Sequence, residues 1–202
     1  MKSGWLVGVV AVAVLAYITL NTLRTEGLDP QGLERGTRLP PFAVPLAESA
    51  QEDQDANVNT RPEGGVPAAC DVRGPDVLGV CAPRERRPLV LVLVVTEAGD
   101  CADQVDVLDR VAPRHEGVRI VAVAVRDDRE DLQRRLRERG WRLPLGYDAD
   151  GAVGQLYGLG PVCPLFTFAG RDARVAGTHR GVLGARELAE RLADLQAGRQ
   201  LP

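Results

Sequence analysis

Four cysteines, Cys70, Cys81, Cys101 and Cys163, carry the most reactive side chains of this 202-residue chain. Thiols form disulfides, act as nucleophiles when deprotonated, and bind metals. We predict no metal site, because no His or further Cys stands at ligand spacing.

Cys70 and Cys81 bracket a short Pro/Gly-rich segment, DVRGPDVLGV. A disulfide there would close a small loop and contribute roughly 2–3 kcal/mol in an oxidising compartment; two unpaired buried thiols are the alternative.

Cys101 stands at the start of a predicted helix, in the sequence EAGDCADQVDVLDRVAPRH. Backbone N–H groups at a helix N-terminus stabilise a thiolate. Asp100 is the expected N-cap, and Asp103 lies in the same turn. A capping carboxylate occupies one of those donors and repels a thiolate. We therefore expect the Cys101 thiol to be only weakly activated.

Hydrophobic patterns indicate the elements that position these residues. PLVLVLVVT (88–96) and GVRIVAVAV (117–125) are short apolar runs, typical of central strands covered on both faces. Helices are predicted at 101–112, 129–140 (with Gly140 as C-cap) and 185–196, further strands at 163–170 and 173–181, and a weak strand followed by a short helix within 141–159. From residue 88 the order is β-α-β-α-β-α-β-β-α, an α/β arrangement that few small folds share.

The chain before residue 88 is less regular. Segment 36–47, interrupted by prolines, predicts an edge strand or short hairpin. Segment 48–88 reads as a surface insertion, with one short strand at Ala56–Thr60. We divide the chain into a membrane anchor (1–23), a polar tether (24–38), N-terminal strands with the insertion (39–87), and a main domain (88–197).

The N-terminal segment predicts the location of the protein. No charge occurs from Gly4 to Leu20, and about 20 apolar residues span a bilayer. Lys2 precedes this segment and Arg24, partly offset by Glu26, follows it, which favours a cytoplasmic N-terminus. A cleaved signal peptide is the alternative, but no A-x-A-like site follows. We expect a single-pass protein of the cell membrane whose C-terminal domain is extracytoplasmic.

This pattern resembles the membrane-anchored redoxins, the TlpA/ResA-type and AhpC/TSA superfamily of thioredoxin-like proteins. GTRLPPFAVPLA is similar to the family's opening, PLVLVLVVT to its central strand, and the chain from Tyr147 to Leu192 to its C-terminal half. The resemblance covers about 36–47 and 88–196. It implies a thioredoxin fold, a central mixed sheet flanked by helices, here preceded by one transmembrane helix.

The resemblance also implies a site. Pro164 would be a cis proline, and the preceding residues Val162 and Cys163 would face the reactive thiol and a bound extended substrate. Thr96 and Glu97 are expected at the strand end beside the helix start, where they would contact substrate.

The family's W-C-x-x-C motif is not present as such. In one register Cys101 matches the second cysteine and Ala98 replaces the nucleophile. In the other, Cys101 is the nucleophile and Gln104 replaces its partner. Since no C-x-x-C partner exists, we hypothesise that Cys101 and Cys163 form a redox-active or structural disulfide; two small buried thiols are the alternative.

Other candidates favour structural roles. Asp148 and Asp150 resemble the start of a calcium loop, but the remaining ligands are missing, so a polar turn is expected. His115 is expected to be solvated and His179 structural. The Arg-rich run 134–139 is expected to form a solvated face with Glu partners rather than an anion site.

Two functions follow. The first is an extracytoplasmic thiol-dependent oxidoreductase in which Cys101 reacts with a partner thiol or a peroxide and Cys163 resolves the product. The second is a redox-inactive binding module that uses the cis-proline groove. No cofactor is predicted. The net charge of −3 and pI near 5.5 argue against nucleic-acid binding.

Overall fold

The computed structural model describes residue 12 and residues 32–49, 55–81 and 87–201. Within this part of the chain, no helix is long and apolar enough to cross a membrane. The predicted anchor at 1–23 lies outside the described residues except for Val12, as does the larger part of the predicted tether at 24–38.

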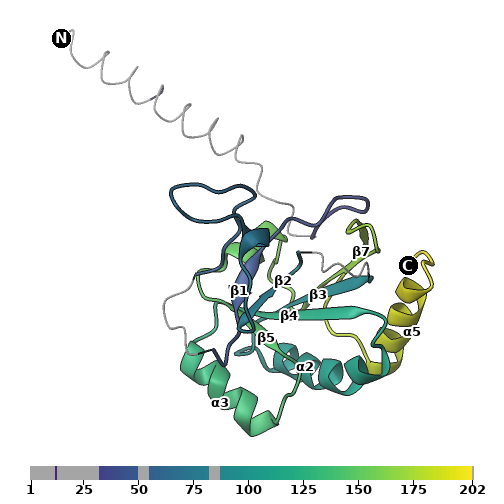
Figure 1. Cartoon of the computed structure of the whole chain (residues 1–202). Helices are drawn as coiled ribbons and strands as arrows, with labels where there is room; N and C mark the ends of the chain where they lie inside the picture. Colours follow the sequence, from purple (N-terminus) through teal and green to yellow (C-terminus); the bar gives the residue numbers. More distant parts are fainter. Residues whose placement is uncertain (1–11, 13–31, 50–54, 82–86, 202) are drawn as a thin grey trace, which may run out of the picture.

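A five-stranded mixed sheet forms the centre of the molecule (Figure 1). Its strands, in the order β5-β4-β3-β6-β7, are β3 (Leu89–Val94), β4 (Arg119–Val125), β5 (Leu145–Asp148), β6 (Leu165–Ala169) and β7 (Val175–Arg180). β3 pairs in parallel with β4, and β4 with β5; β6 and β7 are antiparallel. The α-helices that follow or separate these strands are α2 (Gly99–Val111), α3 (Arg129–Arg139), α4 (Ala152–Leu156) and α5 (Ala185–Gln196). The predicted order of elements from residue 88 is therefore confirmed.

Strand β3 is central because both of its faces are apolar. Val90, Val92 and Val94 belong to one buried cluster, together with side chains of α2, α3 and α5. Leu89, Leu91 and Leu93 alternate with them and belong to a second cluster. Figure 1 shows the three helices on one side of the sheet and β1 and β2 on the other. Side-chain alternation along a strand explains why one continuous apolar run serves two cores.

The second cluster is closed by a small antiparallel pair, β1 (Ala43–Pro45) and β2 (Val77–Gly79). β1 thus pairs with a strand more than 30 residues away in sequence, so the alternative of a short hairpin within 36–47 is wrong. Gly79 is required at this pairing, since a Cβ atom there would collide with the carbonyl oxygen of Phe42. Leu46 bridges to Gly146 of β5, which joins the pair to the main sheet's edge.

The predicted strand at Ala56–Thr60 is also wrong. Only Asn57 forms a bridge, to Ala43. The Asn57 side chain bends the chain: its Oδ1 accepts the N–H of Asn59 and its Nδ2 donates to the carbonyl of Pro67. A side chain that bonds its own neighbouring backbone in this way competes with strand pairing. The insertion also contains a 3₁₀ turn, η1 (Ala69–Asp71), and a second such turn, η2 (Ala112–Arg114), follows α2.

Candidate functional site

A disulfide joins Cys101, in the first turn of α2, to Cys163, which lies two residues before β6, with 5.7 Å between their Cα atoms. The two residues are 62 positions apart in sequence. They meet because β3 and β6 are neighbours: α2 begins just after β3 ends, and β6, antiparallel to β3, begins at the same edge. The backbone N–H of Val95 lies 3.2 Å from each of the two sulfur atoms. One donor thus serves both halves of the disulfide.

The start of α2 differs from the sequence prediction. Ala98, with an extended backbone, is the N-cap, and the helix begins at Gly99. Asp100 lies within the first turn and does not cap it, which corrects the expected role of this residue. The reason is local: the Ala98 carbonyl accepts the N–H groups of Cys101 and Ala102 and so starts the helix two residues earlier. No side chain at the N-cap takes up the first donors of the helix, which removes one of the two effects expected to oppose a Cys101 thiolate.

The segment between β3 and α2 is held from both sides at Thr96. Its N–H donates to both carboxylate oxygens of Asp127, at 3.0 and 2.9 Å, and its carbonyl accepts from Nη1 of Arg135 at 2.9 Å. Asp127 is buried after β4, and burial raises the pKa of its carboxyl group, which the N–H of Thr96 partly offsets. These contacts fix the position of Val95, one residue before Thr96.

Asp127 was missed by the sequence analysis. Its signal was an acidic residue two positions after a buried strand, in a chain where parallel strands end at one edge. Thr96 is fully buried and Glu97 exposed. Of these two predicted contact residues, only Glu97 presents its side chain to solvent.

Gln104 holds the other side of α2. Its Nε2 donates to the carbonyl of Leu183 at 3.2 Å, and its Oε1 accepts the Leu183 N–H at 2.7 Å. Gln104 stands where a C-x-x-C motif counted from Cys101 would have its second cysteine. In this protein the position instead connects α2 to the segment that precedes α5.

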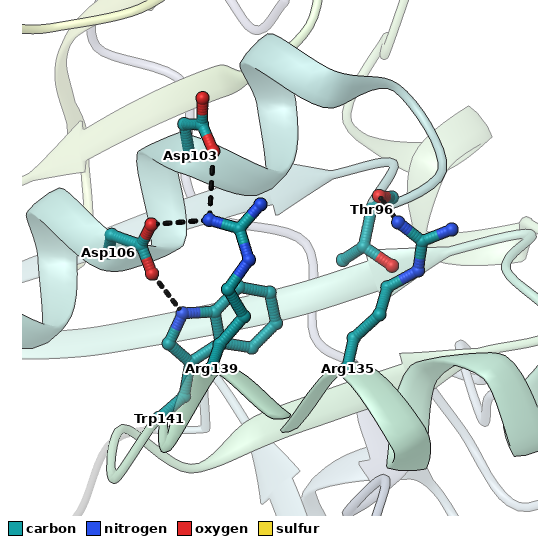
Figure 2. A network of polar contacts seen from close by, with 6 residues as sticks. All are labelled: Thr96, Asp103, Asp106, Arg135, Arg139 and Trp141. Carbon is teal, nitrogen blue, oxygen red and sulfur yellow. Dashed lines mark hydrogen bonds and ion pairs between the residues drawn. The ribbon is translucent and has the colours of Figure 1, made fainter. Parts of the chain in front are cut away.

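A polar network ties α2 to α3 (Figure 2). Nη1 of Arg139 donates to Asp103 at 2.9 Å and to Asp106 at 2.7 Å, and Asp106 also accepts the indole N–H of Trp141. Arg135 lies beside this network and reaches Thr96. Arg139 is exposed, as predicted for the run 134–139, but its partners are Asp103 and Asp106 of α2 rather than Glu residues. Arg135 is half-buried and donates to the carbonyl of Thr96, after the end of β3, so the predicted Glu partners are wrong for these two arginines.

The cis-proline segment extends from the disulfide at Cys163 to the molecular surface at Val162. The Cys163–Pro164 peptide bond is cis, as the resemblance implied, and the Pro164 carbonyl accepts the N–H of Gly181 at 2.8 Å. Pro164 itself is buried, Cys163 is half-buried, and Val162 is 47% exposed. The structure thus brings together Val162, Cys163 and Cys101; their roles in catalysis or substrate binding stay predictions.

The remaining candidates lie in other parts of the fold. Cys70 and Cys81 form a second disulfide, with a Cα–Cα distance of 5.3 Å, that ties η1 to the chain after β2. Asp148 is buried and accepts the N–H groups of Val153 and Gly154 at the start of α4, so the polar turn is observed.

His115 is half-buried after η2. His179 on β7 packs beside Phe166, and burial, with a smaller contribution from Arg191, lowers its pKa.

Several solved structures are similar to this chain. A secreted disulfide oxidoreductase of Mycobacterium tuberculosis, homologous to E. coli DsbE, is 24% identical, covering 55% of this chain and 84% of its own, with a TM-score of 0.50. A Chlorobium tepidum protein provisionally named thiol:disulfide interchange protein DsbE is 17% identical, covering 81% of this chain and 98% of its own, with a TM-score of 0.60. A thiol:disulfide interchange protein of the thioredoxin family, also from Chlorobium tepidum, is 14% identical, covering 81% and 99%, with a TM-score of 0.55.

No family model matches the chain, and no curated protein matches it. The structural likenesses establish the fold: a mixed α/β, thioredoxin-like arrangement of a central sheet and flanking helices. At these identities they leave the activity to be argued from the site itself.

Proposed function

We propose that this chain is a membrane-tethered, extracytoplasmic thiol–disulfide oxidoreductase whose working pair is Cys101–Cys163. The observation that carries the proposal is the disulfide between the first turn of α2 and the residue before the cis proline. A helix N-terminus stabilises a thiolate, and a half-buried partner remains open to exchange. The chain thus has a two-sulfur centre without a C-x-x-C motif.

Support also comes from the surroundings of the sulfurs. The N–H of Val95 donates to both, so it can remain bonded to whichever sulfur is a thiolate after reduction. Thr96 is bonded to Asp127 and Arg135, which keeps this donor in place in both redox states. A preformed donor of this kind lowers the cost of opening the disulfide, because reduction requires no new backbone arrangement.

The substrates that fit this centre are protein thiols and disulfides. The exposed Val162 and the cis-proline segment form a surface of backbone and apolar side chain beside Cys163. An extended peptide that carries a cysteine can lie along such a surface. The neighbours from Mycobacterium tuberculosis and Chlorobium tepidum are named as a disulfide oxidoreductase and as thiol:disulfide interchange proteins, which agrees with this choice.

The proposed location rests on the sequence and on cysteine usage. The uncharged segment from Gly4 to Leu20 is the expected anchor. All four cysteines of the chain are joined in pairs, which is typical of oxidising compartments. Fusion of a periplasmic reporter enzyme after residue 202, with carbonate extraction of membranes, tests both orientation and anchoring. Reporter activity in a membrane-bound fraction is expected; a carbonate-extractable or inactive fusion would refute this part of the proposal.

Insulin reduction with dithiothreitol tests the activity. The wild type is expected to accelerate precipitation of the insulin B chain, and Cys101→Ser is expected to lose this acceleration. The matched control is the double variant Cys70→Ser/Cys81→Ser, which lacks the other disulfide and is expected to retain the activity.

Equal rates for wild type and Cys101→Ser would instead favour a redox-inactive binding module. Peroxide consumption by the reduced wild type, measured in parallel, distinguishes peroxide reduction from exchange. The proposal expects peroxide consumption to be no faster than that of free cysteine at the same thiol concentration.

A further inference from the structure

The two halves of the Cys101–Cys163 disulfide differ in access. Cys101, in the first turn of α2, is only 1% exposed, whereas Cys163 is half-buried. Its neighbour Val162 is among the most exposed large apolar residues of the described chain, at 47%. In thiol–disulfide exchange the incoming thiolate must reach one sulfur directly, so access decides which sulfur is attacked.

Two surface hollows border the segment that carries Cys163. One, of about 510 Å³, is lined by Val162 together with Thr178, His179 and Arg180 of β7. The other, of about 270 Å³, lies against Val95, with Leu159 and Gly160 of the same segment in its wall. Among the described residues that line these hollows, none belongs to α2. Cys163 itself lines neither hollow, but both reach the segment that carries it, so space for a substrate chain lies beside this segment.

Cys101 has instead the surroundings of a good leaving group. It is the third residue of α2, where the helix dipole favours a negative charge. The N–H of Val95 is 3.2 Å from both sulfur atoms and therefore does not distinguish them. Of the two acids near Cys101, Asp103 is paired with Arg139 at 2.9 Å, which offsets its repulsion of a thiolate, while Asp100 lies in the first turn of α2. The thiolate that forms when the disulfide opens is thus stabilised at Cys101, and a more stable leaving thiolate leaves faster.

From these observations we infer that Cys163 is the sulfur that exchanges with substrate and that Cys101 is the leaving and resolving sulfur. This inference rests on the proposed function and reverses the order that the sequence suggested, in which Cys101 reacts first.

The proposed exchange balances as follows for a substrate dithiol. The substrate thiolate forms an S–S bond with Sγ of Cys163, the Cys101–Cys163 bond breaks, and its electron pair leaves on Sγ of Cys101. A second substrate thiolate then attacks the substrate sulfur of this mixed disulfide and releases Cys163 as a thiolate. The substrate is oxidised to a disulfide, and the protein is reduced to two thiols.

For a substrate disulfide the steps run in reverse. The Cys163 thiolate attacks one substrate sulfur, and the other leaves as a thiolate. The Cys101 thiolate then attacks Sγ of Cys163, which restores the protein disulfide and releases the second substrate thiolate. No further oxidant or reductant is needed in either direction.

Variants that lack one cysteine of the pair test the order of attack. Full-length Cys101→Ser and Cys163→Ser each keep one thiol of the pair and the Cys70–Cys81 disulfide. Each is mixed with an aromatic disulfide reagent whose released thiolate is coloured. Cys163 in the first variant is expected to react about 100-fold faster than Cys101 in the second, because a buried thiol reacts only after local opening. In denaturant the two rates are expected to converge, which shows that the difference comes from the fold.

Capture of the mixed disulfide in the wild-type protein gives a test that does not depend on how the variants fold. The oxidised wild-type chain is mixed with 2-mercaptoethanol, quenched in acid, and mapped by peptide mass spectrometry. The adduct is expected on Cys163; an adduct mainly on Cys101, or a Cys163→Ser variant that reacts as fast as Cys101→Ser, would overturn the inferred order. That outcome would leave the proposed function intact, whereas a pair that thiols never open would refute the function itself.

Discussion

The side-chain amide of Gln104 is bonded at both ends to the backbone of Leu183, through its donor at 3.2 Å and its acceptor at 2.7 Å. Both residues are buried. A side chain that satisfies two backbone groups of a distant segment has no apolar equivalent, since its removal leaves both groups without a partner. This contact pair connects α2, which carries Cys101, to the segment before α5, in addition to the apolar packing between them.

Gln104→Leu is therefore expected to lower the free energy of unfolding by about 2–3 kcal/mol, since two buried backbone groups of Leu183 lose their partners. Urea denaturation followed by circular dichroism measures the change. Gln155→Leu on the exposed surface of α4 is the matched control and is expected to change stability by less than about 0.5 kcal/mol. Equal effects of the two substitutions would show that the Gln104 contacts contribute little.

Asp106 is expected to matter for stability through Trp141. Its carboxylate accepts the indole N–H of this buried side chain and pairs with Arg139 (Figure 2). Asp106→Ala is expected to cost about 1–3 kcal/mol, the cost of leaving a buried donor unpaired. The control is Asp103→Ala, which removes only a more exposed ion pair with the same arginine and is expected to cost less than about 1 kcal/mol. A larger loss for Asp103→Ala would contradict this ranking.

The pairing of β1 with β2 predicts a sensitive glycine. A methyl group at Gly79 would overlap the Phe42 carbonyl oxygen, which is backbone and has little freedom to move. We expect Gly79→Ala to destabilise the fold by about 2 kcal/mol or more. Gly99→Ala, where no atom lies within 4 Å of the added carbon, is expected to leave stability unchanged or to raise it by up to about 1 kcal/mol. Thermal unfolding of both variants provides the comparison. A Gly79→Ala variant as stable as the wild type would contradict the close β1–β2 pairing.

Stability is expected to fall with rising pH in one defined window because of Asp148. Burial raises the pKa of its carboxyl group to about 6, despite the opposing N–H groups of Gly154 and Val153. The folded state thus holds this proton more tightly than the unfolded chain, whose carboxyl has a pKa near 3.9. The corresponding stability is complete below about pH 4 and is lost as the pH rises to about 6.

Denaturation at several pH values between these limits measures the effect. Asp127, whose pKa is also raised by burial, contributes in the same direction, so the comparison with Asp148→Asn isolates one group. The variant is expected to show a shallower decline in unfolding free energy than the wild type. Identical slopes for the two proteins would contradict the role assigned to Asp148.

The main elements of this fold could be predicted because their signals are local. β3 was recognisable from a continuous apolar run, α5 from the spacing of Leu188, Leu192 and Leu195, and the end of α3 from Gly140, which adopts the left-handed conformation. Each signal depends on residues within one or two turns of the chain. The meeting of Cys101 with Cys163 followed only from the resemblance, through the fold that it implied.

Two of the errors originate in contacts between distant segments. The partner of β1 lies in β2, and no property of 36–47 indicates it. The contacts of Arg135 and Arg139 depend on how α3 packs against its neighbours. Long arginine side chains can reach several elements, so their partners are set by tertiary structure.

A redox titration of the full-length chain tests the central claim most directly. The protein is equilibrated in thiol buffers of graded potential, free thiols are alkylated, and each disulfide is quantified by peptide mapping. We predict that Cys101–Cys163 is half-reduced between about −120 and −270 mV, the range of exchanging pairs, while Cys70–Cys81 remains oxidised. A Cys101–Cys163 disulfide that stays intact below about −300 mV, as structural disulfides do, would contradict the proposal that this pair exchanges with substrate.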